Sequence, residues 1–252
     1  MSSITMGDKV IEISHLDYSY PDGTRALSDI TLDVREGESM GLIGSNGAGK
    51  STLLLHLNGI LQGNHCVRVL GMPVTKEHLS FIRSRVGMVF QDPDHQLFMP
   101  TVFDDVSFGP VNMGMKKEEV NSSVREALAE VDVLPLAGRS SHHLSVGEKR
   151  RVSIATVLSM KPDIIVLDEP SSNLDPRHRR ELIDLLNRLR MTKIIATHDL
   201  PLVWETCDRV ALMEGGRLCA VGETRAILSD EALMETHGLQ MPYVRMERGK
   251  SK

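Results

Sequence analysis

The feature that most constrains the fold is a glycine-rich stretch, residues 44–51, which reads Gly-Ser-Asn-Gly-Ala-Gly-Lys-Ser. It fits the pattern G-x-x-x-x-G-K-[ST], in which backbone N–H groups form a nest for a polyphosphate. Residues 39–43 before it are typical of a short strand, and residues 52–57 after it of an apolar helix whose N-terminus favours an anion. A strand, this loop and a helix in that order predict a nucleoside-triphosphate site.

Each residue type in the loop has a defined use. The glycines let the backbone curl around the phosphates. Lys50 brings a mobile charge that reaches the β- and γ-phosphates, and the Ser51 hydroxyl is suited to Mg²⁺. The alternative, a glycine-rich turn that binds nothing, is disfavoured by the motifs that follow. The expected phosphate contacts come from Gly44, Ser45, Asn46, Gly47, Ala48, Gly49, Lys50, Ser51 and Thr52.

Composition limits the class of protein. A chain of 252 residues forms one large domain or two small ones, and 41% apolar with 25% charged residues is an ordinary globular mixture. The net charge of −5 argues against a nucleic-acid partner. No apolar run is long enough to span a membrane, and the N-terminal residues lack a signal-peptide pattern. The three cysteines show no C-x-x-C spacing, which favours a reducing cytosol.

Two carboxylates follow the most continuous apolar run. Residues 164–167 (Ile-Ile-Val-Leu) predict a strand buried on both faces, and Asp168 and Glu169 come directly after it. Adjacent carboxylates at a buried strand end are costly unless a metal or a proton transfer uses them. We expect Asp168 to support Mg²⁺ and Glu169 to orient and deprotonate the attacking water.

Two further predicted strands end in polar side chains. The strand over residues 86–90 ends at Gln91, and the strand over residues 193–196 ends just before His198. In a nucleotide-binding sheet, residues at the carboxyl ends of strands face the binding crevice. Gln91 is therefore a candidate for contact with the metal or the attacking water, and His198 for donation to the γ-phosphate.

Two tyrosines stand between predicted strands at residues 10–13 and 30–34, next to a Pro-Asp-Gly turn. A tyrosine beside a nucleotide fold can stack on a purine ring. We expect Tyr20 to do so and Tyr18 to be an ordinary strand aromatic.

From about residue 96 to residue 160, the spacing of the apolar residues becomes typical of helices. A helix is predicted over residues 117–133 and another over residues 150–160. Between them, Ser145 and Glu148 fit the capping-box pattern S-x-x-E. The apolar stretch from Leu97 to Met113, which holds three phenylalanines, is either core of this region or an interface for a helix of another chain.

The remainder alternates between helix and strand. An amphipathic helix follows the loop at residues 171–176, and residues 209–213 and 217–221 predict a hairpin around Gly215-Gly216. From residue 233 onward there is little pattern, so a short tail is expected.

The order of these motifs resembles that of the ATP-binding subunits of ABC transporters over essentially the whole chain. The resemblance rests on the loop at 44–51, Gln91, Leu144-Ser145-Val146-Gly147-Glu148, residues 164–169, Asn173-Leu174-Asp175 and His198. A narrower resemblance, to the ATPase of energy-coupling factor importers and particularly the cobalt/nickel type, rests on residues 18–26, 89–98 and 108–110.

The resemblance implies an α/β fold of the P-loop NTPase class, a single ABC ATPase domain over residues 1–252. Its RecA-like mixed sheet is joined by an N-terminal antiparallel β part and a helical subdomain. Residues 1–95 and 161–232 correspond to the nucleotide-binding core, residues 96–160 to the helical subdomain, and residues 233–252 to a C-terminal tail.

The resemblance also implies roles. Tyr20 would stack on adenine, Ser51, Gln91 and Asp168 would contact Mg²⁺, Glu169 would activate water, and His198 and Lys50 would contact the γ-phosphate of ATP. Two ATPase subunits, identical or different, would pair head to tail. The signature of one subunit would then meet the ATP of the other, next to a D-loop. The signature comprises Ser145, Val146, Gly147 and Glu148, and the D-loop comprises Asn173, Leu174 and Asp175.

Membrane subunits would dock near Leu97–Met113, which places the chain at the cytoplasmic face of a membrane. One departure is Val146, which stands where the family usually has glycine. Whether two copies of this chain build two active sites is left open by that substitution.

Two alternative functions remain open. One is the ATPase of a vitamin importer of the same type, since the nucleotide site does not contact the cargo. The other is a soluble ABC ATPase that acts on DNA or the ribosome; the short spacing between Ser51 and Ser145 disfavours the DNA-repair type. A GTPase is disfavoured because no Asn-Lys-x-Asp motif occurs. Neither His65-Cys66 nor His142-His143 offers enough ligands for a closed metal site.

Overall fold

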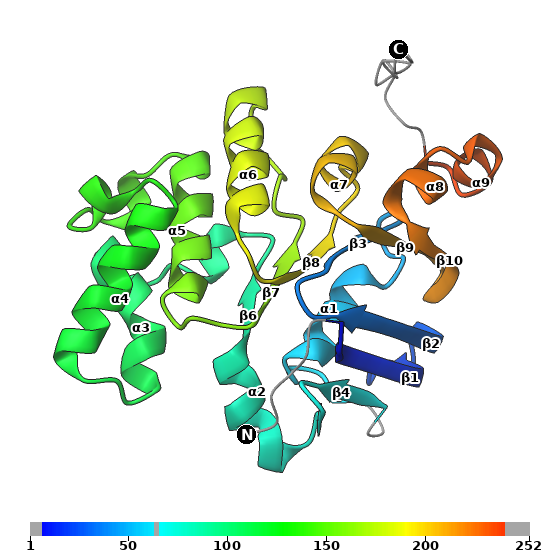
Figure 1. Cartoon of the computed structure of the whole chain (residues 1–252), viewed down its shortest axis with the longest axis horizontal. Coiled ribbons are helices and arrows are strands. Elements are labelled where there is room, and N and C mark those ends of the chain that lie inside the picture. The colour runs from blue at the N-terminus through cyan, green and yellow to red at the C-terminus, as the bar shows by residue number, and fades with distance from the viewer. Residues whose placement is uncertain (1–6, 63–65, 240–252) are drawn as a thin grey trace.

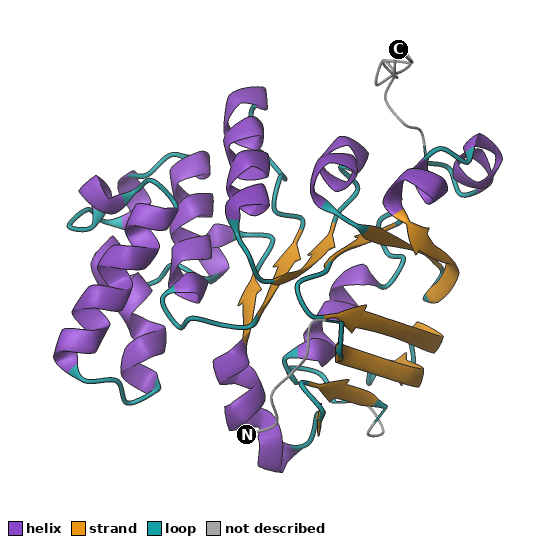
Figure 2. Cartoon of the chain, viewed as in Figure 1, coloured by secondary structure: helices purple, strands orange, loops and turns teal. Residues whose placement is uncertain are grey.

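The computed structural model describes residues 7–62 and 66–239. Its centre is a six-stranded sheet in the order β10-β9-β3-β8-β7-β6, parallel except for β10, which is antiparallel to β9. The strands are β3 (Ser39–Ile43), β6 (Val86–Val89), β7 (Ile164–Asp168), β8 (Thr192–Ala196), β9 (Arg209–Glu214) and β10 (Arg217–Glu223). Figures 1 and 2 show the helices packed around this sheet.

The central strands are buried on both faces, as their continuous apolar runs predict. Every residue of β3, β7 and β8 is buried. Alternate residues of β7 pack into different clusters: Ile165 and Leu167 join the core beneath α6 and α7, and Val166 joins the core around α1. The strand therefore has no polar position before its last residue, Asp168.

A smaller antiparallel sheet has the order β2-β1-β4-β5. It consists of β1 (Lys9–Ser19), β2 (Arg25–Arg35), β4 (Val67–Val69) and β5 (Met72–Pro73). β1 continues past the predicted end at residue 13 and includes Tyr18. An extra residue near His15, whose φ is 51°, shifts the register between Ile13 and Leu16 and lets the ladder continue through a polar stretch.

The helices fall into groups. α1 packs between the two sheets and contacts β2, β4, β7 and β8, while α6 and α7 cover the opposite face of the large sheet. α3, α4 and α5 form a separate group at the β6 edge (Figure 1). The bounds are α1 (Lys50–Leu57), α2 (Leu79–Arg85), α3 (Val102–Asn112), α4 (Lys117–Glu130), α5 (Val146–Leu158), α6 (Pro176–Arg188), α7 (Leu200–Thr206), α8 (Thr224–Leu228) and α9 (Glu231–Thr236).

Helix ends differ from the predictions in two places. α4 ends at Glu130, because Asp132 adopts φ 57° and turns the chain before Val133. The expected patternless tail is wrong for its first residues: α9 runs to Thr236, and Met234 and Leu239 are buried against the core. The remainder of that tail, residues 240–252, lies outside the described residues, as does His65. No helix within the described ranges is long and apolar enough to cross a membrane.

Candidate functional site: a phosphate cradle at the strand ends

The glycine-rich loop joins β3 to α1, as the sequence predicts, and lines a cavity of about 500 Å³. Lys50 is buried and points back into the loop, where its Nζ donates to the carbonyl oxygens of Gly44 at 2.8 Å and Ser45 at 3.1 Å. The same Nζ lies 3.8 Å from Oε1 of Glu169. The cavity is lined by Tyr20, Thr24, Arg25, Ala26, Asn46, Gly47, Ala48, Gly49, Lys50, Ser51, Thr52, Gln91, Glu169 and His198.

The loop requires glycine where it touches other backbone. Gly44 has φ 148°, and a Cβ there would lie 2.1 Å from the carbonyl oxygen of Met213. Gly49 has φ 100°, and its Cβ would lie 2.7 Å from the carbonyl oxygen of Ala26. Backbone cannot move aside as a flexible side chain can. Only glycine at these two positions therefore lets β9 and β2 pack directly against the loop.

We therefore expect Gly44→Ala to lower the free energy of unfolding by about 3 kcal/mol or more, since it adds a backbone clash to a strained φ. Gly23→Ala is the matched control: Gly23 also has positive φ, 87°, but a Cβ there meets nothing within 4 Å. It should cost about 1 kcal/mol. Urea denaturation measures both, and equal losses would contradict the clash.

Asp168 and Glu169 lie at the carboxyl end of β7, and both are buried. Asp168 hydrogen-bonds the Ser51 side chain, while burial raises the pKa of Asp168 above its usual value. Its buried Oδ1 has no hydrogen-bond partner among the described residues. A buried carboxylate oxygen without a donor, next to a serine hydroxyl, is the arrangement that a hard cation such as Mg²⁺ satisfies.

Glu169 is held by the end of β8. Its Oε2 lies 3.1 Å from Thr197 Oγ1, 3.3 Å from the backbone N of His198 and 2.8 Å from His198 Nδ1. Its own backbone N donates to Ala196 and its φ is 43°, a left-handed conformation that turns the side chain at the strand end. One carboxylate and one imidazole from the ends of neighbouring strands thus form a close pair at the cavity.

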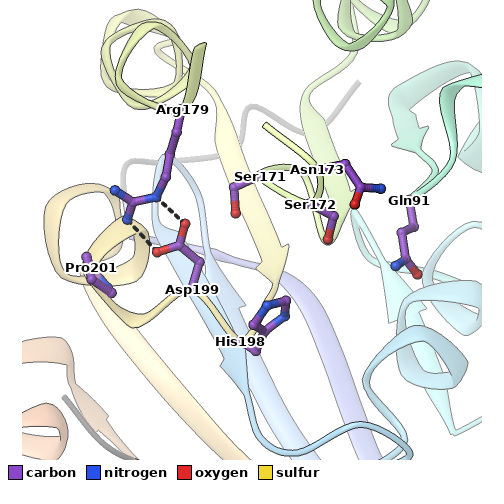
Figure 3. A pocket seen from close by; sticks show the side chains of 8 residues that line it. All are labelled: Gln91, Ser171, Ser172, Asn173, Arg179, His198, Asp199 and Pro201. Atoms are coloured by element: carbon purple, nitrogen blue, oxygen red, sulfur yellow. Dashed lines mark hydrogen bonds and ion pairs between the residues drawn. The ribbon is translucent and has the colours of Figure 1, made fainter. Parts of the chain in front are cut away.

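Gln91 and His198 line both the phosphate cavity and a neighbouring pocket of about 420 Å³ (Figure 3). The pocket's other walls come from the loop after β7, from α6 and from the start of α7: Ser171, Ser172, Asn173, Arg179, Asp199 and Pro201. The two predicted strand-end side chains therefore lie together where the two cavities meet.

Tyr20 lines the cavity and Tyr18 does not. The Tyr20 hydroxyl lies 2.9 Å from Thr52 Oγ1, which fixes the ring beside the start of α1. The Tyr18 ring packs edge-on against both Tyr20, at 5.2 Å between centroids, and His56, at 4.8 Å. Tyr20 is thus the tyrosine placed to meet a base, and its stacking role remains a prediction.

The predicted capping box is present at the start of α5. Ser145 N donates to Glu148 Oε2 at 2.8 Å, and Glu148 N donates to Ser145 Oγ at 3.3 Å. Val146 is exposed, whereas Gly147 is buried and a Cβ there would lie 2.4 Å from the His178 ring on α6. Residues 145–148 line neither of the two cavities, so within this one chain they stand apart from the phosphate site.

The loop 173–175 leads into α6. Asn173 has φ 63°, and Asp175 caps the helix by accepting from the backbone N of Arg177 and of His178. Of the three residues, Asn173 lines the pocket of Figure 3, and Leu174 packs against the core.

The ABC transporter family matches residues 27–172, which include the loop, Gln91, residues 144–148, Asp168 and Glu169. The chain belongs to the ABC transporter family.

Two curated relatives of this ABC ATPase match nearly its whole length. The energy-coupling factor transporter ATP-binding protein EcfA of Carboxydothermus hydrogenoformans is 46% identical over 93% of this chain and 88% of that protein. The cobalt import ATP-binding protein CbiO of Rhodobacter capsulatus is 45% identical over 93% of this chain and 86% of that protein. The chain is thus related to ATP-binding subunits of energy-coupling factor and cobalt importers.

Solved structures agree on the ABC ATPase fold. CbiO1 of Clostridium perfringens, described as part of the transporter complex cbiONQ, superposes with a TM-score of 0.81 at 38% identity, covering 93% of this chain and 96% of that one. The ATP-binding cassette MJ0796, solved as a dimer bound to ADP and Pi, gives 0.76 at 24% identity, covering 85% and 99%. The predicted α/β class with an antiparallel part and helices is confirmed.

Sequence reasoning missed two arginines of this ABC ATPase. Arg150 on α5 is 1% exposed and donates from Nη1 to the carbonyl of Phe90 at 2.8 Å and from Nη2 to that of Gln91 at 2.6 Å; burial lowers the pKa of Arg150 to about 10. Arg179 on α6 pairs with Asp199 through two hydrogen bonds (Figure 3). The only sequence signal for a role of these residues at the site was the position of Asp199, the partner of Arg179, directly after the candidate residue His198.

Proposed function

We propose that this chain is the ATP-hydrolysing subunit of an energy-coupling factor importer whose cargo is cobalt or nickel ions. The observation that carries the proposal is identity of 45% to 46%, over nearly the whole chain, with proteins named for energy-coupling factor transport and cobalt import. A vitamin importer of the same type is the second candidate, since relatives named only for the energy-coupling factor match equally well.

The proposed chemistry uses the groups at the strand ends. The loop N–H groups and Lys50 bind the phosphates, and Ser51, Asp168 and Gln91 hold Mg²⁺, which when bound neutralises charge on the β- and γ-phosphates. Glu169 accepts the proton of the attacking water, and His198, whose Nδ1 lies 2.8 Å from Glu169 Oε2, contacts the γ-phosphate. The unpartnered Oδ1 of Asp168 supports the metal assignment.

We expect Asp168→Asn to lower Mg²⁺-dependent ATPase activity about 10²-fold, because several kcal/mol of charge stabilisation are lost. In EDTA the same variant should be no less stable than the wild type, since burial disfavours the Asp168 carboxylate and raises its pKa. Steady-state ATPase assays and thermal unfolding measure the two effects. Asp184→Asn, on an exposed position of α6, is the control. Undiminished ATPase in Asp168→Asn would refute the role.

An exposed apolar patch supports a membrane partner. It comprises Phe98, Phe108, Val111 and Met113 on and around α3. Phe98 is 61% exposed and Phe108 47%, and their rings contact each other edge-on with centroids 5.2 Å apart. The opposite side of the same stretch is core, with Leu97, Val102 and Val106 buried. One side of this stretch is therefore core, and we propose the exposed patch on the other side as the docking surface.

We propose that two ATPase subunits pair head to tail, so that the exposed start of α5 faces the ATP of its partner. The capping box satisfies the N–H groups of Ser145 and Glu148 and so fixes where the helix begins, and the helix dipole at that end favours phosphate. Mg²⁺ and ATP are then shared between the subunits, at the cytoplasmic face of the membrane.

The test is uptake in cells that express the chain together with membrane subunits of an energy-coupling factor importer. Accumulation of cobalt or nickel that needs Glu169 supports the proposal. Uptake that appears only with a vitamin-binding subunit favours the vitamin importer. A protein that fractionates away from membranes in the presence of those subunits contradicts both.

A further inference from the structure

Three side chains with metal-binding atoms meet near β9, β10 and α9, and Figure 1 shows these elements at the end of the molecule opposite α3, α4 and α5. They are Glu214 at the end of β9, Cys219 on β10 and His237 after α9. One ligand atom from each, a carboxylate oxygen, Sγ and an imidazole nitrogen, lies within 4.8 Å of the other two. His237 Nδ1 lies 2.8 Å from Glu214 Oε2. None of the three lines the ATP cavity.

The hairpin places Cys219 by an irregularity in its ladder. Leu218 pairs with Met213 and Ala220 pairs with Leu212, so Cys219 is one extra residue that faces no partner on β9. Such bulges re-aim a side chain and recur beside functional sites. Here the bulge brings the exposed Cys219 thiol toward Glu214, which ends the opposite strand next to the Gly215-Gly216 turn.

His237 is held in place by the end of α9. Its backbone N bonds back into the helix, and Gly238 follows with φ 65°, which stops the helix. Met234 and Leu239 on either side are buried in the core, and the His237 side chain is only 15% exposed. The imidazole is therefore positioned before any ligand arrives, so little conformational entropy opposes binding.

We propose that Glu214, Cys219 and His237 bind a divalent transition-metal ion such as Zn²⁺ or Co²⁺. Thiolate, imidazole and carboxylate are the ligand types of such ions, and three protein ligands with a water in the fourth position are a common tetrahedral arrangement. Mg²⁺ and Ca²⁺ prefer oxygen ligands and do not fit this set. The Nδ1 of His237 and the Oε2 of Glu214, 2.8 Å apart, offer one nitrogen and one oxygen ligand, and the Cys219 thiol binds such an ion as the thiolate.

A bound ion ties α9 to the β9–β10 hairpin, whose turn contacts the phosphate loop. Gly216 N donates to the carbonyl of Ala48 at 3.1 Å, and Ser28 N donates to the carbonyl of Gly216 at 2.8 Å. The site is thus separated from the ATP cavity by one turn of backbone. The binding proposal itself is independent of the cargo proposed above.

Titration of the full chain with Co²⁺, without nucleotide, tests the site. We expect a single ion per chain, with an absorption band from charge transfer between thiolate and Co²⁺. Cys219→Ser should abolish the band, and Cys219→Ser and His237→Ala should each weaken binding at least about 100-fold, because loss of a ligand costs no less than loss of its outer-shell support. Cys66→Ser is the matched control, since Cys66 lies outside the cluster.

Two comparisons make failure clear. Cys219→Ser should retain the Mg²⁺-dependent ATPase activity measured without Co²⁺, which shows that it folds, and Lys50→Ala should retain the Co²⁺ band, which separates this site from the nucleotide site. Binding that is unchanged in both Cys219→Ser and His237→Ala, or a band that disappears only in Cys66→Ser, would overturn the proposal.

Discussion

Glu169→Gln should retain ATP binding and lose turnover by about 10²- to 10⁴-fold, the range expected when a general base is removed. Glutamine keeps an oxygen that can accept from Thr197 Oγ1 and from the His198 backbone, which lie 3.1 and 3.3 Å from the present carboxylate oxygen. It cannot take a proton from water. ATP that is bound but not hydrolysed should hold two subunits together, so the solution mass should shift from monomer to dimer with Mg-ATP.

Light scattering coupled to size exclusion gives that mass, and a coupled assay gives the rate. Glu126→Gln is the control, because Glu126 is an exposed residue of α4 paired with Lys161. A Glu169→Gln protein with undiminished ATPase activity would remove Glu169 from its proposed role. A protein that binds ATP and stays monomeric would show that Val146 or a missing partner prevents self-pairing, and a second ATPase chain would then be required.

Lys50→Ala should weaken nucleotide binding by about 10²-fold or more. The Lys50 ammonium now donates to the carbonyls of Gly44 and Ser45, and we expect phosphate oxygens to replace these acceptors when ATP binds. Each hydrogen bond to a charged group contributes about 1.5–3 kcal/mol, and every 1.4 kcal/mol is tenfold in affinity. The substitution also removes the cation 3.8 Å from Glu169, which leaves that buried carboxylate next to the phosphates without a counter-charge.

Titration with a fluorescent ATP analogue measures the affinity of Lys50→Ala directly. Lys161→Ala is the matched control, since Lys161 is exposed and pairs with Glu126 at the surface. Exposed pairs of this kind contribute little, so Lys161→Ala should bind ATP as the wild type does. Equal affinities of Lys50→Ala and wild type would mean that backbone N–H groups alone hold the phosphates.

The parts of the site that could be predicted are those encoded in contiguous residues. The loop pattern fixes Lys50 and Ser51 on one turn, and the apolar run before Asp168 and Glu169 fixes a buried strand that ends in carboxylates. Likewise S-x-x-E predicts the capping box of Ser145. In each case the functional residues are neighbours in sequence, so the sequence already predicts that they lie together. The structure adds only the distances between them.

The parts that could not be predicted depend on contacts between distant segments. Arg150 resembles any helical arginine until β6 is placed beside α5, 60 residues away in sequence from the Phe90 carbonyl. The Arg179–Asp199 pair joins two helices, and the bulge at Cys219 exists only in the pairing of β9 with β10. α9 could not be predicted because six residues are too few to show a helical period. Its buried residue packs against a core formed by distant segments.

The contact between Arg150 and the Gln91 loop has a mechanical consequence. α5 begins at the surface proposed to meet a second subunit, and about one turn later Arg150 donates to two backbone carbonyls of the loop. The Gln96 side chain adds a second attachment, accepting from Phe90 N and donating to Ser153 and Thr156 of α5. These hydrogen bonds join α5 and the Gln91 loop into one connected unit. We expect a displacement at the start of α5 to be transmitted to Gln91, which lines the cavity proposed to hold ATP, so that this site responds to the arrival of the proposed partner subunit.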